Sequence, residues 1–210
     1  MRKILILLSA PAIFLASCVS NPDGQKAETS DAVETTVTTD GNSLSVDTSA
    51  STVKWLGQKV TGKHHGEVDI TSGSLIVSED GHLTGGNFEI DLNTIDVQDL
   101  EGEMRDKLMG HLRSEDFFHV ENHPTATFEI TEVTEGATAN ELVVAGNLTI
   151  RGVSKNIKFD ATASELSAES AVLDANFNIA REDWGVSYQG KADDLISKEI
   201  NFDVHLVAKK

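Results

Sequence analysis

The chain has 210 residues, of which 39% are hydrophobic and 24% are charged. This length and composition predict a globular protein of one or two domains with one substantial core. Lysine and arginine together number 17 against 34 aspartates and glutamates, so the formal net charge is −17. Because no stretch concentrates enough positive charge to follow a phosphate backbone, nucleic acid is disfavoured as a partner.

Residues 1–17 have the three parts of an export signal. Arg2 and Lys3 precede an apolar run from Ile4 to Phe14, which is followed by Leu15-Ala16-Ser17-Cys18. At about 1.5 Å of rise per residue, this run is too short to cross a hydrocarbon core of about 30 Å. We therefore expect a cleaved signal peptide and not a retained transmembrane helix.

The segment Leu15-Ala16-Ser17-Cys18 resembles the lipobox of bacterial lipoproteins, in which the cysteine thiolate accepts a diacylglyceryl group before cleavage. The resemblance implies that Cys18 carries acyl chains such as palmitate, and that the protein faces the periplasm from a membrane of the cell envelope. Two or more acyl chains would hold it durably, since one chain binds only marginally. The alternative is an ordinary cleavage site followed by an incidental cysteine. As the only cysteine, Cys18 forms no intramolecular disulfide.

Residues 18–43 are rich in small and polar residues and contain no aromatic side chain. This composition predicts a flexible tether that places the folded domain on the order of 25 to 30 Å from its anchor. Because the tether has no hydrophobic pattern with which to dock, we expect the domain from Leu44 onward to fold alone.

From residue 44 to residue 210, apolar and polar residues alternate in runs separated by turn residues, which predicts half-buried strands. The predicted strands, about eight in number, lie around residues 53–60, 67–77, 88–92, 126–130, 142–150, 157–161, 173–179 and 200–206. Asp80-Gly81 and residues 152–155 fall at tight turns. The fold class is all-β, and an eight-stranded antiparallel barrel is wide enough for one small ligand. A two-sheet sandwich would give much the same alternation.

One segment departs from this alternation. Leucine or methionine recurs every four residues from Leu100 to Leu112, which predicts an amphipathic helix inserted between strands. Asp96 is the expected N-cap, and residues 114–118 are the expected helix exit.

Several segments of the chain resemble the YceI-like family in order and spacing over residues 44–210. The segments are Val53-Lys54-Trp55, residues 108–118 (LMGHLRSEDFF), residues 124–128 (PTATF), residues 148–155 (LTIRGVSK) and residues 179–186 with the motif REDWG. His119 and His123 replace residues that the family often carries at the helix exit, so the resemblance implies no shared partner there.

The resemblance implies an extended lipocalin-like barrel that holds a polyisoprenoid or similar apolar chain. We therefore expect a membrane-anchored lipoprotein that binds a polyisoprenoid or a related lipid or quinone non-covalently, as a carrier or store, without another cofactor. The candidate cavity-lining residues are Trp55, Phe88, Ile90, Leu108, Leu112, Phe117, Phe128, Ile130, Leu148, Ile150, Phe159, Phe177, Ile179, Trp184 and Phe202. In the alternative interpretation, which the alternation alone favours, these side chains fill a solid core of a structural or partner-binding domain. The resemblance reverses that preference.

Three arginines lie in the family-like segments. Arg113, Arg151 and Arg181 could contact a polar head group or pair with nearby acids, and structural pairing is the favoured interpretation. For Arg181, the neighbouring Glu182 and Asp183 are the nearest acids in the sequence.

Histidines could indicate a metal site. His111, His119 and His123 fall within thirteen residues, and His64 and His65 are adjacent. Catalytic zinc sites usually carry two histidines on adjacent turns of one helix, whereas His111 lies on the predicted helix, His119 and His123 lie in its exit, and no cysteine ligand is available. The pattern therefore favours imidazoles without a metal.

A hydrolase would need two carboxylates as acid and base, for which Glu89 with Asp91 or Glu115 with Asp116 are candidates. Because strand residues two apart share a face, the alternation places Glu89 and Asp91 outside the barrel. The sequence has no Gly-x-Ser-x-Gly elbow and no Gly-rich phosphate loop. The sequence therefore favours a binding protein over an enzyme, and it does not indicate an oligomeric state.

Overall fold

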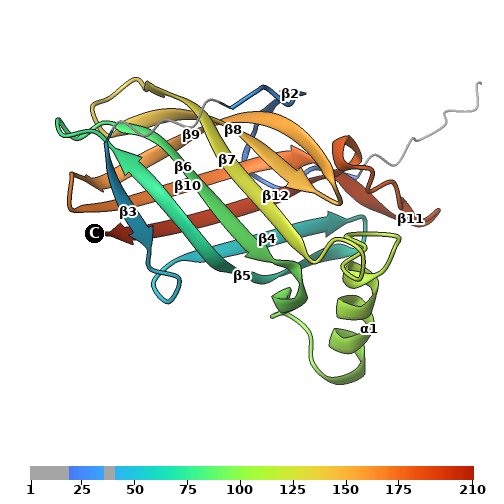
Figure 1. Cartoon of the computed structure of the whole chain (residues 1–210). Helices are drawn as coiled ribbons and strands as arrows, with labels where there is room; N and C mark the ends of the chain where they lie inside the picture. The colour runs from blue at the N-terminus through green and yellow to red at the C-terminus, as the bar shows by residue number, and fades with distance from the viewer. Residues whose placement is uncertain (1–18, 36–40) are drawn as a thin grey trace, which may run out of the picture.

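The computed structural model describes residues 19–35 and 41–210, which form a closed barrel with one α-helix near one end (Figure 1). The predicted signal peptide and Cys18 lie outside the described residues. The strands of the wall are β3 (Asn42–Val46), β4 (Thr52–Lys59), β5 (Gly62–Val77), β6 (Leu83–Asp91), β7 (Thr125–Glu135), β8 (Glu141–Ile150), β9 (Val153–Leu166), β10 (Ser170–Ala180) and β12 (Asp194–Lys209).

Each wall strand pairs antiparallel with its neighbours. The short strands β3 and β4 both lie between β5 and β12, so together they occupy one of the eight positions in the wall. The pairing of β9 with β10, from Ala171 opposite Leu166 to Ala175 opposite Ala161, closes the ring. This pairing confirms the barrel and excludes the two-sheet sandwich.

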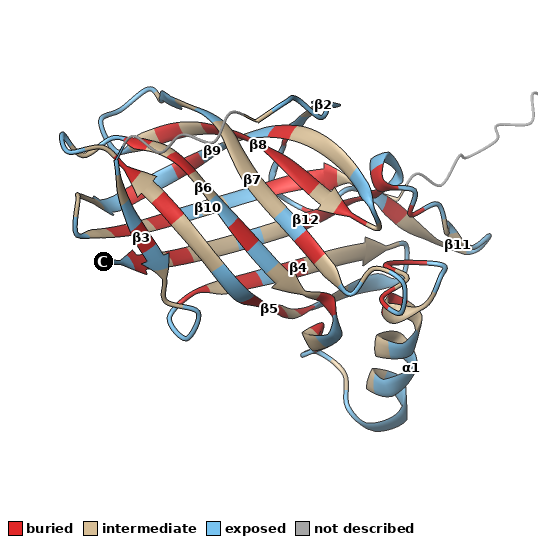
Figure 2. Cartoon of the chain, in the orientation of Figure 1, coloured by how far each residue is buried: buried red, intermediate tan, exposed pale blue. Residues whose placement is uncertain are grey.

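The alternation predicted from the sequence is visible as alternating buried and more exposed positions along the strands (Figure 2). The connection between β8 and β9 shows how local residues fix the register. Arg151 and Gly152 form a two-residue turn between the paired residues Ile150 and Val153, with φ angles of 53° and 74°. Positive φ at both positions matches the twist of the flanking strands, as in type I′ hairpins.

Fully buried apolar residues gather at both ends of the barrel. At one end they include Leu44, Leu75 and Ala208. At the other end the segment between β6 and β7 and the segment after β10 fold over the wall and bury Trp184 and Val186. These segments contain two short 3-10 helices, η1 (Leu92–Thr94) and η2 (Arg181–Trp184), and the helix α1 (Gly102–Arg113).

The expected helix is confirmed, but its predicted N-cap is wrong. Helix α1 follows Glu101, which makes no side-chain cap hydrogen bond. Asp96 lies six residues before the first helical residue, and its carboxylate pairs instead with Arg105. No helix among the described residues is long and apolar enough to span a membrane.

We name residues 19–35 the strap. For these residues the expectation of a flexible tether is wrong. The strap contains β1 (Gln25–Lys26), which pairs in parallel with β10, and β2 (Glu28–Asp31), which pairs antiparallel with β9. Backbone pairing holds these polar residues against the wall, and it needs no hydrophobic pattern. A second short pair joins β11 (Gly190–Lys191) to β12.

Candidate ligand-binding cavity

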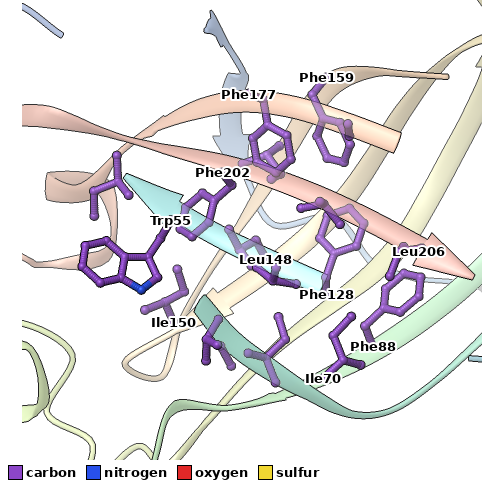
Figure 3. A pocket seen from close by; sticks show the side chains of 18 of the residues that line it. Trp55, Ile70, Phe88, Phe128, Leu148, Ile150, Phe159, Phe177, Phe202 and Leu206 are labelled. Carbon is purple, nitrogen blue, oxygen red and sulfur yellow. The ribbon is translucent and has the colours of Figure 1, made fainter. Parts of the chain in front are cut away.

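An apolar cavity with a volume of about 180 Å³ lies inside the barrel, between its two packed ends (Figure 3). Every wall strand from β4 to β10, and β12, contributes lining side chains. The lining is apolar because the residues that alternate inward along each strand are aliphatic or aromatic.

Five phenylalanines form a continuous arc along the lining, which we name the aromatic arc. Neighbouring ring centroids are 6.3 Å apart for Phe88 and Phe128, 5.8 Å for Phe128 and Phe159, 4.1 Å for Phe159 and Phe177, and 6.0 Å for Phe177 and Phe202. The five rings come from five different strands, β6, β7, β9, β10 and β12.

Part of the aromatic arc remains accessible. Phe128, Phe159 and Phe202 line the cavity and are only half-buried. Because their side chains point inward, the wall itself covers their outer side and their accessible surface faces the lumen. The barrel is therefore hollow at the height of these rings, whereas a solid core would bury them fully.

The cavity volume sets the size of a ligand that fits without rearrangement. A cavity of about 150 Å³ lined by Leu, Ile and Phe binds benzene. The cavity here, about 180 Å³, therefore accommodates about one five-carbon isoprene unit with the side chains in this arrangement. A longer chain requires rings of the aromatic arc to rotate toward the wall.

Most of the side chains predicted to line a cavity do line it. These are Trp55, Phe88, Ile90, Leu112, Phe117, Phe128, Ile130, Leu148, Ile150, Phe159, Phe177 and Phe202. Leu108, Ile179 and Trp184 do not. Leu108 packs against the core from helix α1, and Ile179 and Trp184 are each only 1% exposed in the packed end of the barrel. The indole N–H of Trp184 donates to the Leu148 carbonyl at 3.0 Å.

Sequence reasoning missed other lining residues. Ile95 and Phe118 reach the cavity from the segment between β6 and β7, where the sequence shows no alternation, and Leu92 reaches it from the end of the alternating run at residues 88–92. Further lining residues lie on strands whose alternation would have identified them, for example Val53, Val68, Ile70, Val144, Ile157, Ile200 and Leu206.

The three arginines of the family-like segments are structural, but the expectation that they pair with acids is wrong. Each donates to backbone carbonyls. Arg113 Nη2 donates to Asn93 and Ile95 at 2.8 and 3.2 Å, and Arg151 Nη1 donates to Glu115 at 2.7 Å and to Phe117.

Arg181 Nε donates to the Ser197 carbonyl at 2.8 Å, and its Nη1 donates to the Val186 carbonyl at 2.7 Å. Glu182, the next residue in the chain, does not pair with Arg181, because it is exposed and pairs with Lys198 at 3.4 Å. Burial lowers the pKa of the Arg181 guanidinium.

The histidines lie apart from one another except for one pair. The rings of His119 and His123 are 5.7 Å apart, while His111 packs edge-on against Phe117 and His64 Nδ1 lies 2.7 Å from an Asp99 carboxylate oxygen. Across residues 19–35 and 41–210, no group of three or more His, Cys, Asp or Glu side chains is arranged to hold a metal ion.

The carboxylates considered for hydrolysis lie outside the cavity. Glu89, Glu115 and Asp116 are exposed, and Asp91 Oδ1 accepts the Asn93 backbone N–H at 2.9 Å at the start of η1. None of the four lines the cavity. They form no acid and base pair beside it.

Curated relatives match part of this chain. A UPF0312 protein of Pectobacterium atrosepticum is 43% identical over 75 residues, which make up 36% of this chain and 35% of that protein. A UPF0312 protein of Yersinia enterocolitica is 34% identical over 106 residues, 48% of this chain and 51% of that protein. The chain thus spans about half or less of the length of these relatives.

Solved structures match more of the chain. BcnA of Burkholderia cenocepacia superposes with a TM-score of 0.60 and 19% identity, over 78% of this chain and 99% of that one. A polyisoprenoid binding domain from Saccharophagus degradans, implicated in plant cell wall breakdown, superposes with a TM-score of 0.57 and 19% identity, over 79% and 97%. At these identities the likeness shows the shared fold.

The family comparison covers the whole barrel. The YceI-like domain matches residues 44–208, from β3 to the end of β12. This chain belongs to the YceI-like family.

Proposed function

We propose that this protein binds a long apolar chain, a polyisoprenoid or a related lipid or quinone, inside its barrel, as a carrier or store. The observation that carries this proposal is the apolar cavity of about 180 Å³ lined by every position of the wall. Its fold similarity to a polyisoprenoid binding domain of Saccharophagus degradans supports the same class of ligand. The protein acts as a binding protein and not as an enzyme.

The energetics suit a ligand without polar groups along its length. Each buried CH₂ contributes about 0.8 kcal/mol, so a five-carbon isoprene unit contributes about 4 kcal/mol before the cost of ordering the chain. Beyond the first unit, the ligand must displace rings of the aromatic arc. The half-buried rings of Phe128, Phe159 and Phe202 are the ones with open space beside them.

Two measurements on the predicted mature chain with Cys18→Ser (residues 18–210) test the proposal. Mass spectrometry of an organic extract from the purified protein should find a co-purifying prenyl chain or lipid. Added farnesol should change the tryptophan fluorescence through Trp55, which lines the cavity, whereas Trp184 does not. Trp184→Phe should keep this signal and Trp55→Phe should lose it. Absence of lipid from several hosts, together with no fluorescence change, would leave the non-catalytic structural or partner-binding domain as the better explanation.

The membrane anchor is a further part of the proposal. A lipid on Cys18 would hold the barrel close to a membrane of the bacterial envelope, because the strap contacts the barrel two residues later, at Ser20. Gln58 Nε2 donates to Ser20 Oγ at 2.6 Å, and Ser197 Oγ donates to Asn21 Oδ1 at 2.9 Å. Two residues span at most about 7 Å of chain, far less than the 25 to 30 Å expected of a free tether.

Cell fractionation tests the anchor. Cys18→Ser removes the thiol that forms the thioether, so the protein should move from the membrane fraction to the soluble fraction or remain uncleaved. Unchanged membrane partitioning with a normally processed mass would refute the anchor and leave the cavity proposal intact.

A further inference from the structure

The barrel wall has a seam between β9 and β10. Direct pairing of these two strands stops at Ala175 opposite Ala161. Beyond that point the strap enters between them, where β1 pairs with residues 177–178 of β10 and β2 pairs with residues 155–158 of β9. We name the gap between these two edges the seam. The strap, which precedes the barrel domain in the chain, therefore closes the wall at the seam.

Backbone hydrogen bonds close the seam. An inserted strand satisfies the N–H and C=O groups that the edges of β9 and β10 present. At the centre of the strap, Ala27 is 3% exposed and its N–H donates to the Asn178 carbonyl at 2.9 Å. Without the strap both edges would lose these partners, and the wall would be open on this side.

The first half of the strap, residues 20–27, is held firmly on β10 and β12. Asn178 Nδ2 donates to the Pro22 carbonyl at 2.9 Å, and both of these residues are buried. Lys26 Nζ lies 3.6 Å from Glu199 Oε1 on β12. These contacts are additional to the bonds of Ser20 and Asn21 described above, so this half is fixed to the outside of the wall along its length.

The second half of the strap, residues 28–35, is held more weakly. Each of these residues is exposed or half-buried. Beyond the backbone pairs of β2, the contacts are polar: Lys155 Nζ donates to Asp31 at 2.9 Å, and Asn147 Nδ2 donates to the Val33 carbonyl at 2.8 Å. Water can replace such bonds when a segment detaches. With so little apolar burial, this half should detach at a lower free energy than any wall strand.

Thr29 adds an unfavourable contact to the second half. It lies opposite Ile157, which lines the cavity, and residues directly opposite in an antiparallel pair project to the same face. The Thr29 side chain therefore lies on the inner side of the wall. Its Oγ1 is buried there and has no hydrogen-bond partner among the described residues. A buried hydroxyl without a partner destabilises the docked strap, whereas water satisfies it when the strap detaches.

The aromatic arc lies directly behind the seam. The stacked rings of Phe159 and Phe177 come from the two strands that part here, and both line the cavity (Figure 3). Phe177 is the β10 partner of Gln25 in the strap. Phe159 is half-buried and has open space beside it. An opened seam therefore leads sideways into the lumen past one ring that has room to move.

The two ends of the barrel are packed more tightly than the seam. Leu44 and Leu75 are 0% exposed at one end, and Trp184 and Val186 are 1% exposed at the other. An axial route would have to remove such side chains from apolar contacts, at a cost that grows with the apolar area exposed. A route through the seam breaks mainly polar contacts on the outside of the wall.

Resting on the proposed function, we propose that the second half of the strap is a hinged section of the wall, and that the apolar ligand enters and leaves through the seam when this half peels away from β9. The first half remains on β10 and β12 and acts as the hinge. The strength of docking on β9 then sets the rate of ligand exchange. Because the closed cavity is the same in every case, a change in docking should alter the rates of binding and release but not the affinity.

A disulfide between the strap and β9 tests the proposal by locking the seam. Glu28 and Lys158 are exposed and directly opposite in the β2–β9 pairing, and neither side chain forms a hydrogen bond or ion pair in the described chain. Opposite Cα atoms in antiparallel strands are about 4.5 to 5.5 Å apart, which suits a disulfide. In the mature Cys18→Ser chain, which has no other cysteine, the variant is Glu28→Cys with Lys158→Cys.

The readout is the release of bound farnesol into phosphatidylcholine vesicles, followed by Trp55 fluorescence in a stopped-flow instrument. Oxidation of the cysteine pair should slow release at least tenfold and leave the affinity unchanged, and dithiothreitol should restore the original rate. Glu89→Cys with Thr127→Cys is the matched control, because these exposed residues are opposite each other in the permanent pairing of β6 with β7. That disulfide should leave the release rate unchanged.

Thr29→Val tests the same step without a disulfide. Valine has nearly the shape of threonine and removes the unpartnered hydroxyl, so it should dock the strap more firmly and slow release severalfold. Thr29→Ser keeps the hydroxyl and should not slow release. Asn147→Ala removes the bond to the Val33 carbonyl and should speed release severalfold. Unchanged release in folded Thr29→Val and Asn147→Ala proteins would contradict the proposal.

Amide hydrogen exchange of the unsubstituted chain gives a measurement that needs no ligand. Residues 28–35 should exchange faster than residues 20–27 and faster than strand β8. Equal protection of the two halves of the strap would count against a hinge between them.

The outcomes separate this proposal from the proposed function. Farnesol that binds the oxidised Glu28→Cys with Lys158→Cys protein and leaves it at the unsubstituted rate would overturn the seam route and leave the apolar cavity in place. Absence of any fluorescence change on adding farnesol to the unsubstituted chain would overturn the proposed function, and the seam route with it.

Discussion

Phe159 and Phe177 stack with their ring centroids 4.1 Å apart and their planes 15° apart, at the point where β9 and β10 stop pairing. The two rings hold the inner side of the seam together where the backbone no longer does. Phe177 is buried and Phe159 is half-buried, so the stack has one fixed ring and one ring with space beside it. We therefore expect the Phe159 ring to be able to move and enlarge the cavity without unfolding the wall.

Phe159→Ala should therefore cost less than the removal of a fully buried phenylalanine. We expect a loss of about 1 to 2 kcal/mol in the free energy of unfolding, below the usual range of about 3 to 5 kcal/mol. The enlarged lumen should bind longer prenyl chains relatively better. Urea denaturation and titration with prenols of increasing length check the two effects. A loss above about 3 kcal/mol would show that the ring is part of a solid core.

Two alanine positions separate a hollow lumen from a packed one. Ala126 is 3% exposed, whereas Ala175 is half-buried, and both line the cavity. Ala175→Trp should keep the free energy of unfolding within about 1 kcal/mol and weaken farnesol binding, because the indole enters open space. Ala126→Trp should cost about 1 to 3 kcal/mol through overpacking. Equal destabilisation by the two variants would contradict the hollow lumen.

Two glycines of β5 should respond differently to the same substitution. A Cβ at Gly66 would collide with the Asp96 carbonyl, which also accepts the Trp55 indole N–H at 3.2 Å, whereas a Cβ at Gly62 would meet nothing within 4 Å. We expect Gly66→Ala to cost about 1 to 3 kcal/mol and to shift the Trp55 emission. Gly62→Ala should leave both unchanged. Thermal unfolding and fluorescence spectra provide the comparison, and a neutral Gly66→Ala would be inconsistent with this contact.

Asp194 should contribute to the acid sensitivity of the fold. The hydrogen bond from Lys59, together with those from Thr61, lowers the pKa of Asp194 to about 2 from its ordinary value of 3.8. Because the folded-state pKa is the lower one, the stabilisation is present above about pH 4 and is lost as the pH falls toward 2.

Asp194→Asn should consequently make the decline in unfolding free energy between pH 4 and pH 2 shallower, as measured by urea titrations at several pH values. The exposed neighbour Asp193 forms none of these hydrogen bonds, so Asp193→Asn should follow the unsubstituted protein. Identical pH profiles for Asp194→Asn and the unsubstituted chain would refute the assignment.

The sequence by itself determined the eight longer strands of the wall, the inserted helix and most of the inward-facing residues, but not the short strand β3. These features depend on local periodicity: alternation along a strand such as Thr125–Glu135 places Ala126 and Phe128 on one face wherever that strand packs. The tight turn expected at residues 152–155 lies instead at Arg151 and Gly152, and strand β9 already begins at Val153.

Only the tertiary structure decided how the wall closes, how large the lumen is and where the strap lies. Alternation shows that Phe128 and Phe159 point inward, but the space between them depends on strands distant in sequence. The position of the strap could not be predicted from the sequence. Residues 25–31 bind the wall through backbone pairing, which requires no pattern of side chains. Likewise, the buried Arg181 has acidic neighbours in the sequence, and only the folded chain turns its guanidinium toward the carbonyls of Ser197 and Val186.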